Sequence, residues 1–152
     1  MSLPATKRGG LEYLKGLDET ELLARCIYGE ARGEGIDGMS AVGHVVLNRR
    51  EDGRFGKGLK GVILRSKQFS CFNTDDPNFA KLTRPELNDD SISVCRDVAA
   101  YLLELSTDER RADDPTHGAT HYHSESIRPS WTRSLRMVFC RRIGRHLFWK
   151  EV

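Results

Sequence analysis

Residues 27–34 read Ile27-Tyr28-Gly29-Glu30-Ala31-Arg32-Gly33-Glu34, and they decide the fold because an apolar helical stripe runs there into an acid and then into glycine. Asp18, followed by Glu21 three residues later, resembles a capping box, which marks a helix start. Apolar residues then recur at three- and four-residue spacing, at Leu22, Leu23, Cys26 and Ile27. This spacing predicts a helix from about Asp18 to Ala31 that ends at Gly33.

The Glu30 side chain is predicted to point toward the core. At about 100° per residue it lies within roughly 40° of Cys26 and about 20° of Leu23 around the helix axis. Burial without a partner raises the pKa of a carboxyl, so that the group holds a proton near neutral pH. General-acid catalysis needs a carboxyl in this protonated state. The alternative is that Glu30 merely ends the helix, turned to solvent or paired with Arg32.

Two further helices follow from the spacing of apolar residues. One begins at Asp37 and runs to about Arg49, and we expect it to be the central, most buried helix, through Met39, Val42, Val45 and Val46. His44 and Asn48 lie four residues apart on it, a pattern more typical of a satisfied core contact than of a site. Another helix begins at an Asp89 or Asp90 cap and carries the stripe Ile92, Cys95, Val98, Ala99, Leu102 and Leu105.

The remaining segments are shorter. Residues 59–65 form one or two helical turns or a brief strand, residues 75–88 form a surface loop, and residues 106–116 form a charged linker. Strands are predicted at 119–124, 136–142 and 146–150, with Gly144 in the turn before the last. The pattern predicts a mostly helical α+β fold with a small antiparallel sheet. We expect a flexible N-terminal arm over residues 1–16 and a single domain over residues 17–152.

Composition excludes several classes of protein. The chain has 152 residues, 38% of them hydrophobic and 30% charged, which suits one globular domain and is too apolar for a disordered chain. A net charge of +2 does not indicate a nucleic-acid-binding protein. The chain contains no run of about 18 apolar residues, so no membrane span is predicted. Residues 1–10 lack the apolar segment of a signal peptide.

The cysteines are widely scattered, at Cys26, Cys71, Cys95 and Cys140. No C-x-x-C pair occurs, so a zinc ribbon or a thioredoxin-like site is not expected. Two of them, Cys26 and Cys95, fall on apolar helical stripes, where a free thiol is a common core residue. The pattern favours buried thiols over a disulfide framework.

A histidine cluster offers a second kind of chemistry. His121 and His123 alternate with Tyr122, so on a strand they share a face and, with His117, could hold zinc. The spacing matches no zinc signature, and histidines on strands also line sugar-binding clefts. Aromatic residues that stack on sugars are a further candidate set, of which Tyr122 and Trp131 flank a polar loop. The basic cluster Arg141, Arg142 and Arg145 is typical of a solvated face.

Several blocks of this chain resemble the spore-cortex-lytic and cell wall hydrolase family (SleB/CwlJ-like). The most specific are Gly29-Glu30-Ala31-Arg32-Gly33-Glu34 and Val45-Val46-Leu47-Asn48-Arg49. Weaker matches follow in order, at Gly61-Val62-Ile63, Gln68-Phe69-Ser70, Asp114-Pro115-Thr116, Gly118-Ala119-Thr120-His121-Tyr122 and Ile143-Gly144-Arg145-His146-Leu147-Phe148. Together they cover the chain from about Leu22 to Trp149.

The resemblance implies a lysozyme-like domain that cleaves the glycan strands of peptidoglycan between N-acetylmuramic acid and N-acetylglucosamine. It also implies that Glu30 is the catalytic acid. Some members resemble lytic transglycosylases, in which the muramic acid 6-hydroxyl attacks and leaves a 1,6-anhydro end. That mechanism needs one carboxylate. Glu34 could supply a second carboxylate, but its position after Gly33 favours a role in capping, in sugar binding or in pairing with an arginine. His123 departs from the Tyr-Tyr-Asn ending that other members show.

The sequence thus predicts Glu30 as acid and base, with no metal and no cofactor. We expect the sugars to be bound by Glu34, Gln68, Phe69, Ser70, His121, Tyr122, His123 and Trp131. The protein is expected to be a monomer that acts on the cell wall and binds neither nucleic acid nor membrane. A short chain without a leader resembles a phage lysis or entry enzyme. The alternatives are a zinc-dependent amidase or peptidase using His117, His121 and His123, and a non-catalytic wall-binding module.

Overall fold

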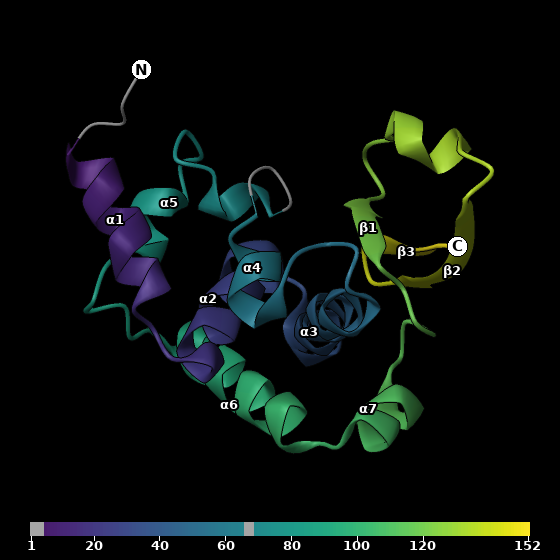
Figure 1. The fold of residues 1–152 in the computed structure, drawn as a ribbon, viewed down its shortest axis with the longest axis horizontal. Coiled ribbons are helices and arrows are strands. Elements are labelled where there is room, and N and C mark those ends of the chain that lie inside the picture. The colour runs from purple at the N-terminus through teal and green to yellow at the C-terminus, as the bar shows by residue number, and fades with distance from the viewer. Residues whose placement is uncertain (1–4, 66–68) are drawn as a thin grey trace.

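The computed structural model describes residues 5–65 and 69–152. Most helices gather on one side and a three-stranded sheet lies on the other, with α3 between them and α7 below the sheet (Figure 1). The mostly helical α+β class expected from the sequence is therefore confirmed. The elements are α1 (Ala5–Lys15), α2 (Glu19–Ala31), α3 (Gly35–Asp52), α4 (Gly58–Ile63), η1 (Ser70–Phe72), α5 (Phe79–Leu82), α6 (Asp90–Glu104), α7 (Thr107–Asp113), β1 (His121–Ser124), η2 (Ser130–Arg133), β2 (Met137–Ile143) and β3 (His146–Glu151).

Helix α2 begins where its cap predicts. Asp18 Oδ1 accepts a hydrogen bond from the backbone N–H of Glu21 at 2.8 Å. The Glu21 side chain does not complete a capping box but pairs with Arg25 and Arg96. The predicted stripe is fully buried, since Leu22, Leu23, Cys26 and Ile27 all have 0% exposure. Helix α2 packs by this face against α3 and α6.

Helix α3 is the central helix, as the sequence predicts. Gly43 lets α6 approach α3 closely, because a Cβ at this position would lie 2.5 Å from Leu102 Cδ1 of α6. On its other side, Ala41 and Val45 form a small apolar cluster with Ala119 and Phe148. Helix α3 therefore joins the helical core to the sheet.

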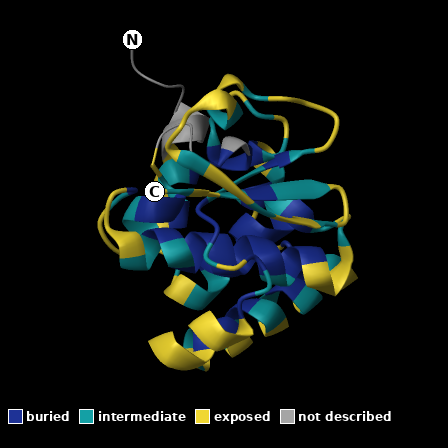
Figure 2. Cartoon of the chain, turned by 90° about the vertical axis from the view of Figure 1, so that its right-hand side faces the viewer, coloured by how far each residue is buried: buried dark blue, intermediate teal, exposed yellow. Residues whose placement is uncertain are grey.

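The sheet is antiparallel with strand order β1-β3-β2, so β3 is the middle strand. Its register pairs Tyr122 with Phe148 and His121 with Trp149. All three strands and the Gly144 turn, where φ is +58°, agree with the sequence prediction. Figure 2 shows buried helices behind the sheet and exposed loops beyond it.

Among the described residues, three α-helices lie where the sequence predicts irregular structure, and two of them, α1 and α5, are held by apolar packing. Residues 5–15 form helix α1 instead of a loosely held arm, because Leu14 is fully buried in the core and Leu11 packs against it. The predicted loop 75–88 contains α5, whose Phe79 and Leu82 are buried. In both cases tertiary packing of a few apolar residues outweighs weak local signals.

The predicted linker 106–116 contains helix α7. Ser106 and Glu109 form a capping box that starts it. Its one buried residue is Arg110, which is 2% exposed and reaches α3. Apolar periodicity cannot detect a helix that docks by a charged side chain, which explains the error.

Arg110 joins a buried polar network on α3. Its Nε donates to Glu51 Oε2 at 2.9 Å, its Nη2 donates to Asn48 Oδ1 at 2.8 Å, and its Nη1 donates to His44 Nδ1 at 3.1 Å. Burial lowers the pKa of His44. The prediction of satisfied contacts is confirmed for the Asn48 amide, which donates to Asp114 and Ala119 and accepts from Arg110. It is confirmed only in part for His44, whose Nε2 has no hydrogen-bond partner among the described residues.

All four cysteines are free thiols, of which Cys26, Cys71 and Cys95 are buried and Cys140 is partly exposed. This agrees with the prediction for three of the four positions. Within residues 5–65 and 69–152, no helix has the length and apolar character needed to cross a membrane.

Candidate functional site

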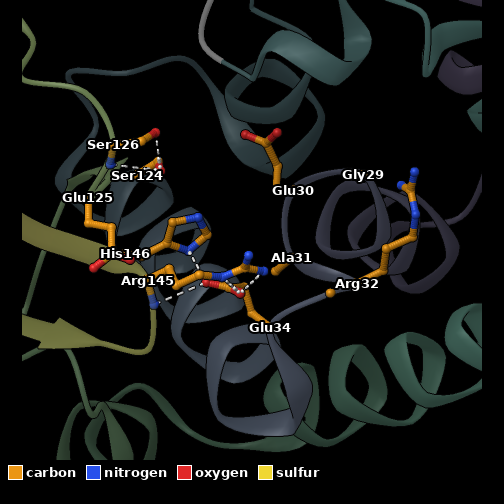
Figure 3. Close-up of a pocket in the computed structure, with 11 residues that line it drawn as sticks. Gly29, Glu30, Ala31, Arg32, Glu34, Ser124, Glu125, Ser126, Arg145 and His146 are labelled. Atoms are coloured by element: carbon orange, nitrogen blue, oxygen red, sulfur yellow. Dashed lines mark hydrogen bonds and ion pairs between the residues drawn. The ribbon is translucent and has the colours of Figure 1, made fainter.

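Glu30 lies in the last turn of α2 at the edge of a cavity of about 600 Å³. Three segments line the cavity (Figure 3): the end of α2 with the turn after it, the end of β1 with the loop that follows, and the β2–β3 turn. Its lining residues are Gly29, Glu30, Ala31, Arg32, Gly33, Glu34, Ser124, Glu125, Ser126, Arg145 and His146. The cavity therefore lies between the helical part and the sheet.

The Glu30 carboxyl has two side-chain donors. The Tyr122 hydroxyl donates to Glu30 Oε1 at 2.6 Å, and the Cys71 thiol is the second donor. Burial raises the pKa values of both Tyr122 and Cys71, so each keeps its proton. These donors come from β1 and η1, so the acid is held by segments that are distant in sequence.

Burial also raises the pKa of Glu30, as its place on the apolar stripe predicts. The hydrogen bonds from Tyr122 and Cys71 and the charge of Arg49 act in the opposite direction, and the charge of Asp76 adds to the rise. Desolvation is the largest of these effects. Glu30 therefore holds its proton to higher pH than a solvated glutamate.

The alternative in which Glu30 pairs with Arg32 is wrong. Arg32 donates to the Tyr28 carbonyl at 3.2 Å and to Asn78 Oδ1 at 3.0 Å. Its guanidinium also lies over the Tyr28 ring, at 4.7 Å from the centroid. In Figure 3 the Arg32 side chain points away from Glu30.

Gly29 allows η1 to approach the acid. A Cβ at this position would lie 2.7 Å from Cys71 Sγ and 2.9 Å from Leu82 Cδ1. The missing side chain thus lets the Cys71 thiol reach Glu30.

We expect Gly29→Ala to lower the free energy of unfolding by about 1–3 kcal/mol, because overpacking displaces η1. Gly9→Ala is the matched control, since a Cβ there meets nothing within 4 Å. Chemical denaturation measures both. Equal effects of the two substitutions would contradict the close approach at Gly29.

Glu34 and Arg145 form the opposite end of the cavity (Figure 3). The backbone N–H of Arg145 donates to Glu34 Oε1 at 3.2 Å, while Nε and Nη2 donate to Oε2 at 3.0 and 2.8 Å. These bonds lower the pKa of Glu34, so this carboxylate is ionised. Pairing with an arginine was one of the roles expected for Glu34. Arg145 is exposed, as the sequence predicts for its basic cluster, but its place beside Glu34 is not predicted.

His121 and His123 share a face of β1, as expected, but it is the face away from Glu30. Both rings pack against Trp131 of η2, with centroid separations of 5.2 and 5.5 Å. Tyr122 alternates with them and therefore faces the helices and Glu30. The structure thus brings Tyr122 to the acid but leaves His121, His123 and Trp131 outside the cavity lining.

The three histidines of the zinc alternative do not converge. His117 is exposed and lines a separate cavity with Asn48 and Lys150. Over the described part of the chain, no three His, Cys, Asp or Glu side chains are grouped as metal ligands. Burial lowers the pKa of His121 to about 4, so this ring is neutral at physiological pH.

Two of the other predicted sugar-binding residues, Phe69 and Ser70, lie at η1. Phe69 is 2% exposed, and the Arg49 guanidinium lies 5.1 Å from its ring centroid, so it is a core residue and not an open stacking platform. Ser70 is the first residue of η1. Gln68 lies outside the described residues.

Sequence reasoning missed Cys71, Ser124, Ser126 and His146 at the site. Strand alternation carries a signal for one of them. On β3, His146 alternates with Leu147 and shares a face with Phe148, which is buried against α3. A histidine on that face must also point toward the helices.

Comparison with known proteins agrees with this architecture. The profile of the cell wall hydrolase family matches residues 33–149. A spore cortex-lytic enzyme of Halalkalibacterium halodurans is 31% identical over 132 residues, which cover 86% of this chain and 34% of that protein. One from Bacillus cereus is 29% identical over 136 residues, which cover 88% of this chain and 44% of that protein. The chain therefore spans less than half the length of these relatives.

Two solved structures share the fold. The catalytic domain of the germination-specific lytic transglycosylase SleB from Bacillus anthracis aligns with a TM-score of 0.64 at 24% identity, covering 89% of this chain and 98% of that one. The catalytic domain of the Bacillus cereus SleB protein aligns with a TM-score of 0.64 at 25% identity, covering 87% and 89%. The profile match over most of its length, together with the 31% identical relative, shows that the chain belongs to the cell wall hydrolase family.

Proposed function

We propose that the chain cleaves the glycan strand of peptidoglycan between N-acetylmuramic acid and N-acetylglucosamine, with Glu30 as the general acid. The observation that carries this proposal is a carboxyl with a raised pKa, held by Tyr122 at the edge of a cavity of about 600 Å³. The family relationship supports the substrate, because the relatives are spore cortex-lytic enzymes. Glu30 lies three residues before the matched range, so its role rests on geometry.

In the proposed reaction, protonated Glu30 gives its proton to the glycosidic oxygen as the bond from C1 to that oxygen breaks. In a single-carboxyl scheme, Glu30 then takes a proton from the hydroxyl that attacks C1. The Tyr122 and Cys71 donors stabilise the intervening carboxylate.

Glu34 is not the second carboxylate of a glycosidase pair in this proposal. Its oxygens accept three hydrogen bonds from Arg145, which leaves it poorly placed to attack a sugar. The attacking group is then a hydroxyl that the protein does not supply, and the muramic acid 6-hydroxyl is the one we favour. That choice makes the enzyme a lytic transglycosylase, whereas attack by water makes it a muramidase.

In this proposal the residues that line the cavity act without a cofactor. We infer that the protein acts as a monomer in the cell envelope, where its substrate lies. Tyr122 orients the acid, and Glu34, Ser124 and Ser126 contact the sugars from the cavity walls.

Product analysis tests the proposed function. Purified peptidoglycan is digested with the wild type and with Glu30→Gln, and the products are identified by mass spectrometry. Anhydro-muropeptides from the wild type alone support a transglycosylase, and reducing-end muropeptides from the wild type alone support a hydrolase. New peptide amino termini, produced equally by Glu30→Gln and abolished by a chelator, would instead establish the zinc amidase. Wall binding with no released fragment would leave only a binding module.

We expect Tyr122→Phe to lower kcat by roughly tenfold, because the acid loses a donor worth about 1.4 kcal/mol. The Tyr122 hydrogen bond lowers the pKa of Glu30, so its loss raises that pKa further. The alkaline limb of the pH–rate profile then moves to higher pH. Tyr101→Phe, at a side chain that is 54% exposed, is the control. An unchanged alkaline limb in Tyr122→Phe would show that Glu30 does not set it.

A further inference from the structure

His146 is a partly buried imidazole in the same cavity as Glu30. It is the first residue of β3, its side chain is 13% exposed, and its ring lies 5.1 Å from the Tyr122 ring. Tyr122 is the residue whose hydroxyl binds Glu30. Figure 3 shows the His146 ring with one edge turned to Glu34 and the other turned to the open space beside Glu30.

The ring edge that carries Nδ1 faces a fixed negative charge, the Glu34 carboxylate at the end of the cavity. His146 Nδ1 lies 3.8 Å from Glu34 Oε1 and has no hydrogen-bond partner. Arg145 holds Glu34 in place and ionised, with the Glu34 side chain only 10% exposed. An ionised carboxylate beside Nδ1 favours the tautomer with the proton on that nitrogen, which leaves the Nε2 lone pair free.

Other charged groups also act on the ring. Burial lowers the pKa of His146, and the charges of Arg145 and His123 lower it further. The charge of Glu34 raises it. Glu30 and Glu125 also line the cavity. Burial is the largest of these effects, so His146 is neutral and able to accept a proton at neutral pH.

We propose that His146, oriented by Glu34, is the general base that takes the proton of the attacking hydroxyl. This inference rests on the proposed function. It leaves Glu30 as the acid but assigns the removal of the proton from the attacking hydroxyl to a separate residue. Glu34 acts through His146 and is a positioning residue.

The bond from C1 to the glycosidic oxygen breaks, and that oxygen takes the Glu30 proton. The attacking oxygen, from the muramic acid 6-hydroxyl or from water, bonds to C1 and gives its proton to His146 Nε2. The resulting imidazolium is stabilised by the Glu34 carboxylate. Solvent in the open cavity then carries a proton from His146 to Glu30, which restores both groups.

The test replaces His146 with asparagine, whose amide keeps a polar atom near the Nδ1 position and removes Nε2. We expect kcat on purified peptidoglycan to fall by about 10²-fold or more with little change in KM, as for a lost general base. The low-pH limb of the pH–rate profile, which reports the base, should also disappear. His117→Asn is the matched control, because His117 lies in the other cavity and asparagine tolerates its positive φ of 58°.

Glu34→Gln tests the positioning role. Removing the negative charge lowers the pKa of His146, so the low-pH limb should move to lower pH while the alkaline limb stays in place. A loss of kcat in His146→Asn with an unchanged low-pH limb would mean a structural role and would overturn the proposal. Thermal unfolding of each variant confirms that it is folded.

The two proposals fail in different ways. If the wild type releases glycan fragments, Glu30→Gln releases none, and His146→Asn stays within about twofold of the wild type, the base is not His146 and only this inference is wrong. If the wild type releases no glycan fragment, the proposed function itself is wrong. Mass spectrometry of the wild-type products identifies the attacking hydroxyl, since the substrate's hydroxyl gives anhydro ends and water gives reducing ends.

Discussion

Glu30→Gln is expected to lower the rate of glycan cleavage by roughly 10²–10⁴-fold, the usual contribution of a general acid. Glutamine keeps the shape of the side chain and still accepts the Tyr122 hydrogen bond, but it has no acidic proton to give. Initial rates of muropeptide release measure the loss. Glu86→Gln, at an exposed position, is the control and should act like the wild type.

The same substitution is expected to stabilise the protein at neutral pH. The folded pKa of Glu30 is raised above its value of 4.5 in a solvated chain. The folded state therefore binds more protons than the unfolded state, and stability is lost as pH rises through the folded pKa. Glutamine does not titrate, so the gain in the free energy of unfolding should be present near pH 7. It should be absent below about pH 4, where Glu30 is protonated in both the folded and the unfolded state.

Denaturant unfolding at the two pH values measures this gain. Glu86→Gln should show no difference between them. A Glu30→Gln variant that is inactive but no more stable at neutral pH would mean that burial of Glu30 costs the native protein nothing. The raised pKa of Glu30 would then need a cause other than burial.

Arg110→Ala is expected to have the largest effect on stability. It leaves the Glu51 carboxylate, Asn48 Oδ1 and His44 Nδ1 without the donor that joins them. Removing one partner of a buried ion pair typically costs about 3–5 kcal/mol. For a chain of this size, the midpoint of thermal unfolding should fall by on the order of 10 °C.

Arg111→Ala is the matched control for Arg110→Ala. Arg111 also pairs with Glu51, at 3.3 Å, but its side chain is 64% exposed. Solvent screens such a pair, so its loss should cost less than about 1 kcal/mol. If the two variants unfold at the same temperature, the buried network does not hold α7 to the fold.

The long helices were predictable because several signals agree at each of them. Helix α2 has a cap at Asp18 and an apolar stripe, and α6 has a cap at Asp89, whose side chain accepts from the N–H of Ile92. The direction of Glu30 follows from the same periodicity. The strands were predictable because Gly144 separates two runs of alternating character.

The partners of Glu30 were harder to predict. Periodicity says which face of an element a residue occupies, but not what that face meets. His121 and His123 were correctly placed on one face of β1, yet only packing shows that Tyr122 on the other face meets the acid. Cys71 reaches Glu30 because Gly29 has no side chain in the way. No local sequence pattern indicates this tertiary contact.

The middle position of β3 has a consequence for the time at which the site around Glu30 can first be complete. Glu30 and Tyr122 are 92 residues apart, and β1 gains its antiparallel partner only when residues 146–151 have left the ribosome. A nascent chain therefore carries its acid long before it carries the strand that orients it. We expect the growing polypeptide to be inert until that strand emerges.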